Sequence, residues 1–229
     1  AAASAVLARI GPLAAELGVV LPVSFYERDG ERRFNAVCVF DADGSRLGVY
    51  RKSHVPDDPG YREKRYCDDG DTGFRVWETA FGRLGVGICW DQWFPEAARA
   101  MVLLGADVLL YPSAIGSDPL YPGGSPMAQW RRCMQGHAAA SFCPVVASNR
   151  VGQEHGRDGG VLDFLGGSFA TDQHGAVIAE ADAASEDICM ATLDLDVVHR
   201  ERAMWGLLAD RRPDLYGLLV ERPAGSAGA

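Results

Sequence analysis

The sequence predicts a mixed α/β fold, in which helices cover a sheet that contains both parallel and antiparallel strands. In the middle of the chain, short apolar runs alternate with helical patterns, which is typical of parallel strands joined by helices. Near both ends strands follow one another directly, which favours antiparallel pairing. The 229 residues, 48% of them hydrophobic, suffice for one sizeable domain. We expect that domain to cover residues 1–222 and the tail 223–229 to be disordered.

The first part of the chain predicts a helix followed by an antiparallel meander. Aliphatic residues recur at helical spacing from Val6 to Leu17, and Gly18 ends the pattern, so we expect a helix over 5–17. Runs rich in Val and aromatic residues then predict three strands, with a turn at 41–44 between the last two. The strands are expected at 19–26, 33–40 and 47–51.

Two long polar segments, 52–73 and 112–126, each follow a predicted strand, and connections of that length inside a domain are usually functional or disordered. Between them we expect strands at 74–78, 84–88 and 107–111, and a helix from Pro95 to near Gly105. After them we expect helices at 127–141, 195–205 and 214–220, strands at 144–149, 168–171, 177–181 and 188–193, and a charged, glycine-rich loop at 150–163.

Composition limits the classes of partner. The net charge of −9 and pI of about 5.0, without a Lys/Arg cluster, disfavour nucleic acid and anionic membranes and favour a cationic small-molecule substrate. No apolar run approaches the roughly 20 residues of a membrane span. Six cysteines lie apart, without CxxC or zinc-type spacing, so we expect a reducing, cytoplasmic location and no metal site.

Cys89 follows a buried strand and precedes the helix that begins near Pro95. Ligands bind at this edge of open α/β sheets, and free backbone N–H groups near a helix start favour a thiolate. The alternative is a buried structural cysteine, and the pattern alone leaves both interpretations open.

Lys52 also closes a strand, so it can meet Cys89 at one edge of the sheet, lower the pKa of the thiol and hold an oxyanion. Glu63, in the segment between them, can fix Lys52 or an attacking water. The alternatives are a solvated lysine at a strand end and a surface carboxylate.

Three segments resemble the nitrilase superfamily of carbon–nitrogen hydrolases. They are residues 50–56, 85–96 and 111–116. The chain is most similar to the N-carbamoylputrescine amidase branch of that family, on residues 59–64, 134–138 and 210–216 and on Cys-Trp-Asp-Gln-Trp-Phe-Pro-Glu-Ala-Ala-Arg at 89–99.

The resemblance implies a four-layer α-β-β-α sandwich and a Glu-Lys-Cys catalytic set with a second Glu. It places the cysteine at Cys89, the lysine at Lys52 and the second glutamate at Glu63, with the Trp90 N–H and Lys52 holding the oxyanion. Trp90 also lines the substrate pocket in this interpretation. The resemblance implies no metal or organic cofactor and a homo-oligomer.

The first catalytic glutamate of the family has no match here, because Glu16 lies in a predicted helix and Glu27 ends a different strand. By this resemblance the chain is expected to be truncated, lacking the family's first strand, first helix and second strand, and its activity to be impaired.

The implied reaction is hydrolysis of the ureido C–N bond of N-carbamoylputrescine to putrescine, CO2 and ammonia. Asp91 and Asp118 are candidates to receive the distal ammonium, and solvated loop carboxylates are the alternative. Two other functions stay open. One is another amidase of the family, such as an N-carbamoyl amino acid hydrolase, which needs a cation for the substrate carboxylate. The other is an inactive remnant that serves as an interaction protein.

We expect residues 1–229 to be alkylated at Cys89 yet to turn over N-carbamoylputrescine at least about a hundredfold more slowly than a form that carries the first glutamate, since general acid–base catalysis contributes about 10²–10⁴-fold per assisted step. Labelling and kcat of both forms test this expectation. Equal kcat values would show that this glutamate is dispensable.

Overall fold

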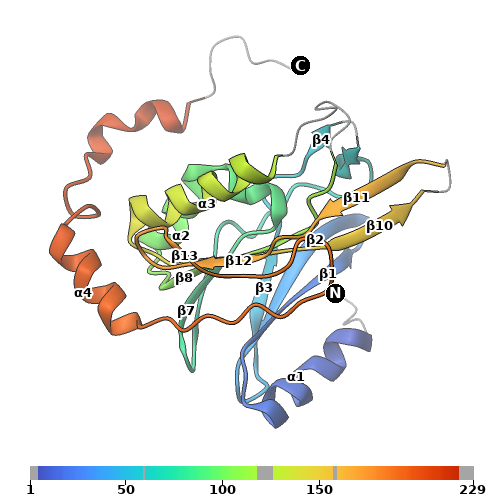
Figure 1. Cartoon of the computed structure of the whole chain (residues 1–229), viewed down its shortest axis with the longest axis horizontal. Coiled ribbons are helices and arrows are strands. Elements are labelled where there is room, and N and C mark those ends of the chain that lie inside the picture. The colour runs from blue at the N-terminus through green and yellow to red at the C-terminus, as the bar shows by residue number, and fades with distance from the viewer. Residues whose placement is uncertain (1–4, 59, 118–125, 157–158, 222–229) are drawn as a thin grey trace.

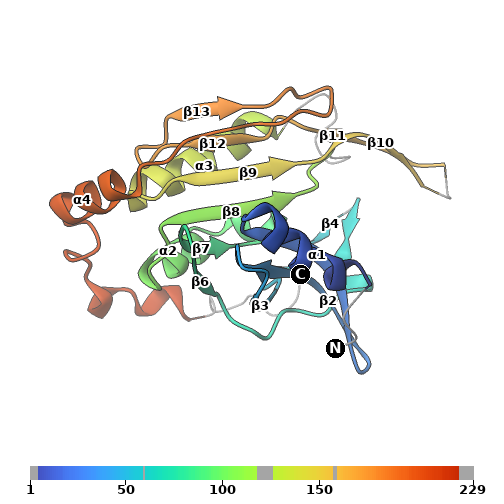
Figure 2. The ribbon, with the colours of Figure 1, turned by 90° about the horizontal axis from the view of Figure 1, so that it is seen from below.

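The chain forms four layers in the order helix, sheet, sheet, helices (Figures 1 and 2). The computed structural model describes residues 5–58, 60–117, 126–156 and 159–221. Two sheets pack face to face. One helix covers the outer face of the first sheet, and two helices cover the outer face of the second. The predicted four-layer α-β-β-α sandwich is therefore confirmed.

The first sheet is the predicted meander of β1 (Leu21–Asp29), β2 (Arg32–Phe40) and β3 (Arg46–Arg51), antiparallel throughout. Helix α1 (Ala5–Leu17) has the predicted bounds and covers one face of this sheet. Side chains alternate between the two faces along a strand, and in the second half of β2 both sets are apolar and buried. Cys38 and Phe40 pack towards α1, while Val37 and Val39 pack towards the second sheet.

The second sheet has six strands in the order β13-β12-β9-β8-β7-β6. Its centre is parallel, with β7 beside β8 and β8 beside β9, and its outer pairs are antiparallel. The bounds are β6 (Val76–Thr79), β7 (Gly82–Val86), β8 (Val108–Ser113), β9 (Val145–Asn149), β12 (Phe169–Thr171) and β13 (Val177–Glu180). The mixed sheet predicted from the alternation of strands and helices is thus confirmed.

Helices α2 (Pro95–Leu103) and α3 (Met127–Ser141) are the crossovers between the parallel strands and cover the outer face of the six-stranded sheet. Their buried side chains, Met101, Trp130 and Met134, pack on the strands through a continuous core. Helix α4 (Leu195–Trp205) follows, and Figure 1 shows it at the margin of the molecule with the segment after it. None of the helices in the described ranges is long and apolar enough to cross a membrane.

The inter-sheet core determines where the site forms. It consists of side chains from both sheets: Val37, Val39, Tyr50, Trp77, Val86 and Ile88. Strands β3 and β7 both contribute to this core, and residues that follow them line one cavity. Those residues include Lys52 and Cys89.

Three predictions were wrong in detail. The expected loop 150–163 contains a hairpin of β10 (Val151–His155) and β11 (Val161–Leu165), whose mostly exposed side chains leave no apolar alternation to detect. The expected strand 188–193 does not form, and Ile188 and Met190 point into solvent. The expected helix 214–220 is two 3₁₀ turns, Pro213–Leu215 and Gly217–Leu219.

In the segment 52–73, β4 (Asp57–Asp58) pairs with β5 (Tyr61–Arg62). The predicted tail 223–229 lies outside the described residues.

Gly70 allows two backbone segments to touch beside the site. A Cβ atom at this position would lie 2.2 Å from the Arg51 carbonyl oxygen and 2.6 Å from that of Lys52. We expect Gly70→Ala to lower the free energy of unfolding by about 1–3 kcal/mol, because backbone has to move. Urea denaturation measures the change. The matched control is Gly136→Ala, in helix α3 with open space around the new methyl group, where alanine should stabilise by about 0.5–1 kcal/mol. A Gly70→Ala protein as stable as the wild type would contradict the steric argument.

Candidate active site

Cys89 lies at a sharp corner between the six-stranded sheet and helix α2. Strand β7 ends at Val86, a 3₁₀ turn occupies Cys89–Trp93, and α2 begins at Pro95. The backbone of Cys89 has φ of 45°, a left-handed conformation that residues other than glycine rarely adopt. Such a conformation costs about 1–3 kcal/mol and is concentrated at functional sites. The corner is the strand-to-helix junction that the sequence predicts.

Lys52 is almost fully buried, with 2% of its surface exposed. Its Nζ forms an ion pair with Glu63 Oε2 at 2.5 Å, and Glu63 Oε1 accepts a hydrogen bond of 2.8 Å from Asn35 Nδ2. The Lys52 backbone is also fixed, because its N–H donates to the Asn35 carbonyl and its carbonyl accepts from the Gly70 N–H. A buried ammonium needs such partners to remain charged.

A cavity of about 630 Å³ contains all four predicted site residues in its lining: Cys89, Lys52, Glu63 and Trp90. Its size is in the range usual for small-molecule sites. Much of its remaining described wall is aromatic, from Phe25, Tyr26, Tyr61, Tyr66, Trp93 and Phe164. The walls come from both sheets and from the segments after β3, β7 and β8.

Charge inside the cavity is mostly negative. Among the described lining residues, Lys52 is the cation and its charge is matched by Glu63. Asp58, on β4, adds an exposed carboxylate at the wall. The described lining therefore offers a carboxylate to a distal ammonium, and it offers a distal carboxylate no cation other than the paired Lys52.

The thiol of Cys89 is subject to opposing effects. Burial raises its pKa above the usual value, and this effect outweighs the Lys52 ammonium and a backbone hydrogen bond from Ala114, which both lower the pKa. The sequence-based expectation that Lys52 lowers the pKa is right for the direction of that one contribution and incomplete for the sum. A second cysteine of the lining, Cys67, has a pKa raised to about 11 by burial and by Glu63.

Comparison of the sequence with known proteins identifies relatives that are hydrolases. The sequence description of carbon-nitrogen hydrolases matches residues 1–203. The chain belongs to the carbon-nitrogen hydrolase family. It is 53% identical over 219 residues to the N-carbamoylputrescine amidase of Arabidopsis thaliana, covering 93% of this chain and 73% of that protein. It is 52% identical over 210 residues to the citrullinase of Francisella tularensis, covering 92% of this chain and 73% of that protein.

The fold comparison agrees with the sequence comparison. The crystal structure of a carbon-nitrogen hydrolase from Helicobacter pylori superimposes with a TM-score of 0.88 at 42% identity, covering 94% of this chain and 76% of that chain. This chain is therefore a carbon-nitrogen hydrolase with the fold of the nitrilase superfamily.

One expectation about this carbon-nitrogen hydrolase is wrong. Asp91 is neither a solvated carboxylate nor an acceptor for a distal ammonium, because it is fully buried, accepts hydrogen bonds from within the protein and is absent from the cavity lining. The other candidate, Asp118, lies outside the described residues. His137 is buried and donates from Nε2 to the Gln92 carbonyl at 2.8 Å, and burial lowers its pKa.

Sequence reasoning missed Asn35 and Asp58. Asn35 interrupts an apolar strand, and that lone polar residue was the available signal for a buried hydrogen-bonding role. Asp58 was one acid among many in a polar segment and carried no signal. Over the described residues, no group of three or more His, Cys, Asp or Glu side chains is arranged to hold a metal ion.

Neutralising the buried ion pair of the hydrolase should raise the pKa of Cys89, because the ammonium that partly offsets burial is lost. The variant is Lys52→Met combined with Glu63→Gln, which leaves no unpaired charge. The rate of alkylation by iodoacetamide is measured against pH, with the labelled peptide identified by mass spectrometry. The midpoint should move to higher pH, so that alkylation at neutral pH is slower. Lys64→Met, on the same turn but exposed, is the control and should leave the midpoint in place. A midpoint that falls in the double variant would contradict the role of Lys52.

Proposed function

We propose that this chain acts on N-carbamoylputrescine, hydrolysing its ureido C–N bond with Cys89 as the nucleophile. The observation that carries the proposal is one aromatic-walled cavity that contains Cys89, the buried Lys52–Glu63 pair and an additional carboxylate. The similarity to N-carbamoylputrescine amidases supports the same substrate.

In the proposed reaction, the Cys89 thiolate attacks the ureido carbonyl carbon. The oxyanion that forms is held by the Lys52 ammonium and by the backbone N–H of Trp90, groups fixed in place before the reaction. The C–N bond to the terminal nitrogen breaks, that nitrogen takes up the proton given up by the Cys89 thiol and leaves as ammonia, and a carbamoyl thioester remains on Cys89. Water then attacks the thioester and releases the thiol and a carbamate, which decomposes to CO2 and putrescine.

Lys52 suits this role because its position is fixed at three points. Glu63 holds the ammonium, and Asn35 and Gly70 hold the backbone. A preorganised charge of this kind needs no rearrangement when the oxyanion forms, which is the main advantage of an enzyme site over water. Glu63 is proposed as the residue that orients Lys52, because Lys52 Nζ and Asn35 Nδ2 occupy its two oxygens.

A second candidate substrate class is a ureido amino acid, because the citrullinase of Francisella tularensis is almost as similar to this chain. An N-carbamoyl amino acid brings a carboxylate alone into the cavity, and citrulline brings a carboxylate beside an ammonium. The described lining offers that carboxylate no cation beyond the paired Lys52, and Asp58 would repel it. This charge balance favours the diamine derivative over citrulline and over N-carbamoyl amino acids.

The homo-oligomeric state stays a prediction.

The test compares kcat/KM for N-carbamoylputrescine, citrulline and N-butylurea, which lacks the distal charge. N-Carbamoylputrescine should be the best substrate. Asp58→Asn should reduce kcat/KM for it by about two- to fivefold, the worth of an exposed charge pair, and leave N-butylurea unchanged. Asp57→Asn, on the same short strand but outside the cavity lining, is the control. Cys89→Ala should abolish turnover of all three.

Two results would overturn the proposal. Citrulline turned over better than N-carbamoylputrescine would reassign the substrate class. Retained turnover in Cys89→Ala would remove the nucleophile.

A further inference from the structure

Asp91 is a fully buried carboxylate whose two oxygens each accept two hydrogen bonds. Oδ1 accepts from the His54 N–H at 2.9 Å and from His54 Nδ1 at 2.8 Å. Oδ2 accepts from the Tyr50 hydroxyl and from the Ile88 N–H, both at 2.8 Å. A buried carboxylate is stable only when its oxygens are satisfied in this way.

The donors come from the two segments that carry the proposed catalytic groups. Tyr50 and His54 lie two residues before and two residues after Lys52, and Ile88 directly precedes Cys89. Lys52 follows strand β3 of the three-stranded sheet, and Cys89 follows strand β7 of the six-stranded sheet. These two sheets have no backbone ladder between them in the described ranges. Asp91 therefore joins the two segments through a side chain.

Asp91 also closes the turn around Cys89. Its N–H donates to the Ile88 carbonyl at 3.0 Å, while its carboxylate accepts from the Ile88 N–H. This reciprocal pair encloses Cys89, whose left-handed backbone needs such support to persist. Tyr50 and His54, which donate to Asp91, have further contacts of their own. Tyr50 accepts from the Ser53 N–H, and the His54 ring stacks on Phe94 with a centroid distance of 3.7 Å.

We propose that Asp91 is a positioning residue that sets the placement of the Cys89 thiol against the Lys52 ammonium. This inference rests on the catalytic roles proposed above for Cys89 and Lys52. Lys52 is anchored independently by Asn35, Glu63 and Gly70, so the effect of Asp91 falls on the Cys89 turn. Without the carboxylate, the turn relaxes and the thiol moves out of the field of the ammonium.

Loss of the Asp91 carboxylate has two opposite effects on the pKa of Cys89, one through the lost charge and one through the changed position of the thiol. The charged groups that act on Cys89 are Lys52, Glu63 and Asp91, and the buried phenols of Tyr50 and Tyr111 lie close to Asp91. Lys52 lowers the pKa of Cys89 more strongly than Asp91 raises it. Loss of the Asp91 charge alone would lower the pKa. A thiol that has moved out of the field of Lys52 loses the larger of these two contributions, so its pKa rises.

The test uses Asp91→Asn, in which the amide would oppose the Ile88 N–H. The matched control is Asp107→Asn. Asp107 is also a buried carboxylate with several donors, Arg83 and His199 among them, but it lies outside the cavity lining. Alkylation of Cys89 by iodoacetamide is followed against pH, and kcat and KM are measured with N-carbamoylputrescine.

In Asp91→Asn we expect the alkylation midpoint to move to higher pH. We also expect kcat to fall by about 10- to 100-fold, the effect of a misplacement near 1 Å, with KM changed less than about threefold. Asp107→Asn should lose a similar amount of thermal stability but keep the wild-type midpoint and kcat. A merely structural role for Asp91 would make the two variants alike.

The proposal is overturned if the midpoint of Asp91→Asn falls or stays in place, or if its kcat matches that of the wild type. If the wild type turns over no ureide, the proposed function fails, and the alkylation midpoint alone decides the role of Asp91. If Asp91→Asn does not fold, Tyr50→Phe replaces it, because that variant removes one donor and keeps the carboxylate charge. Its midpoint should also rise, and an unmoved midpoint would overturn the proposal.

Discussion

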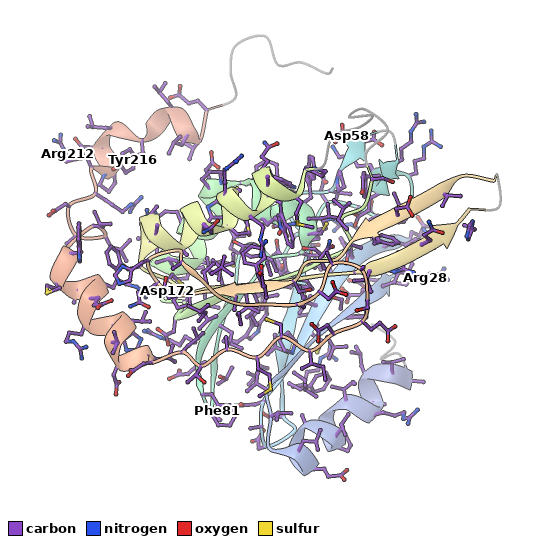
Figure 3. All side chains as sticks on the ribbon, viewed as in Figure 1. Arg28, Asp58, Phe81, Asp172, Arg212 and Tyr216 are labelled. Carbon is purple, nitrogen blue, oxygen red and sulfur yellow. The ribbon has the colours of Figure 1, made fainter. Side chains whose placement is uncertain are left out.

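A charged ammonium buried between two sheets is the constraint on which the site depends. Lys52 Nζ is paired with Glu63 at 2.5 Å, and Glu63 in turn accepts a hydrogen bond from Asn35 on strand β2. Figure 3 shows the side chains on the ribbon, with many of them between the layers. The backbone on either side of Lys52 is held by hydrogen bonds to Asn35 and Gly70, and the close approach at Gly70 is possible because glycine has no side chain.

The same low-polarity setting shapes the reactivity of Cys89. Burial makes the thiolate costly, and the nearby ammonium compensates in part. In the proposed mechanism, substrate brings a developing negative charge next to Lys52, and the ammonium would stabilise that oxyanion more than it stabilises the resting thiol. The same cavity thus contains the left-handed Cys89, the fixed ammonium and the aromatic walls.

Local patterns predicted most of the helices and strands and made Cys89 a candidate, while the four layers and the assignment of Lys52 and Glu63 came from the resemblance to the family. Helix α1 follows from aliphatic spacing, and Cys89 from a strand that runs into a proline-initiated helix. Features that depend on distant partners left no such trace. The hairpin β10–β11 is mostly exposed and held by backbone pairing, so its sequence resembled a loop. The burial of Asp91 depends on donors about 40 positions away, and a lone aspartate after a cysteine gives no sign of them.

The division of the site between two sheets also matters for engineering. Lys52 extends from one sheet and Cys89 from the other, and the layer between them is held by apolar side chains such as Val37 and Val86. Repacking that layer, a common route to greater thermostability, would slide one half of the site past the other even though no polar residue had been touched. The outer layers, where α1, α2 and α3 meet solvent, offer substitutions that leave this spacing alone.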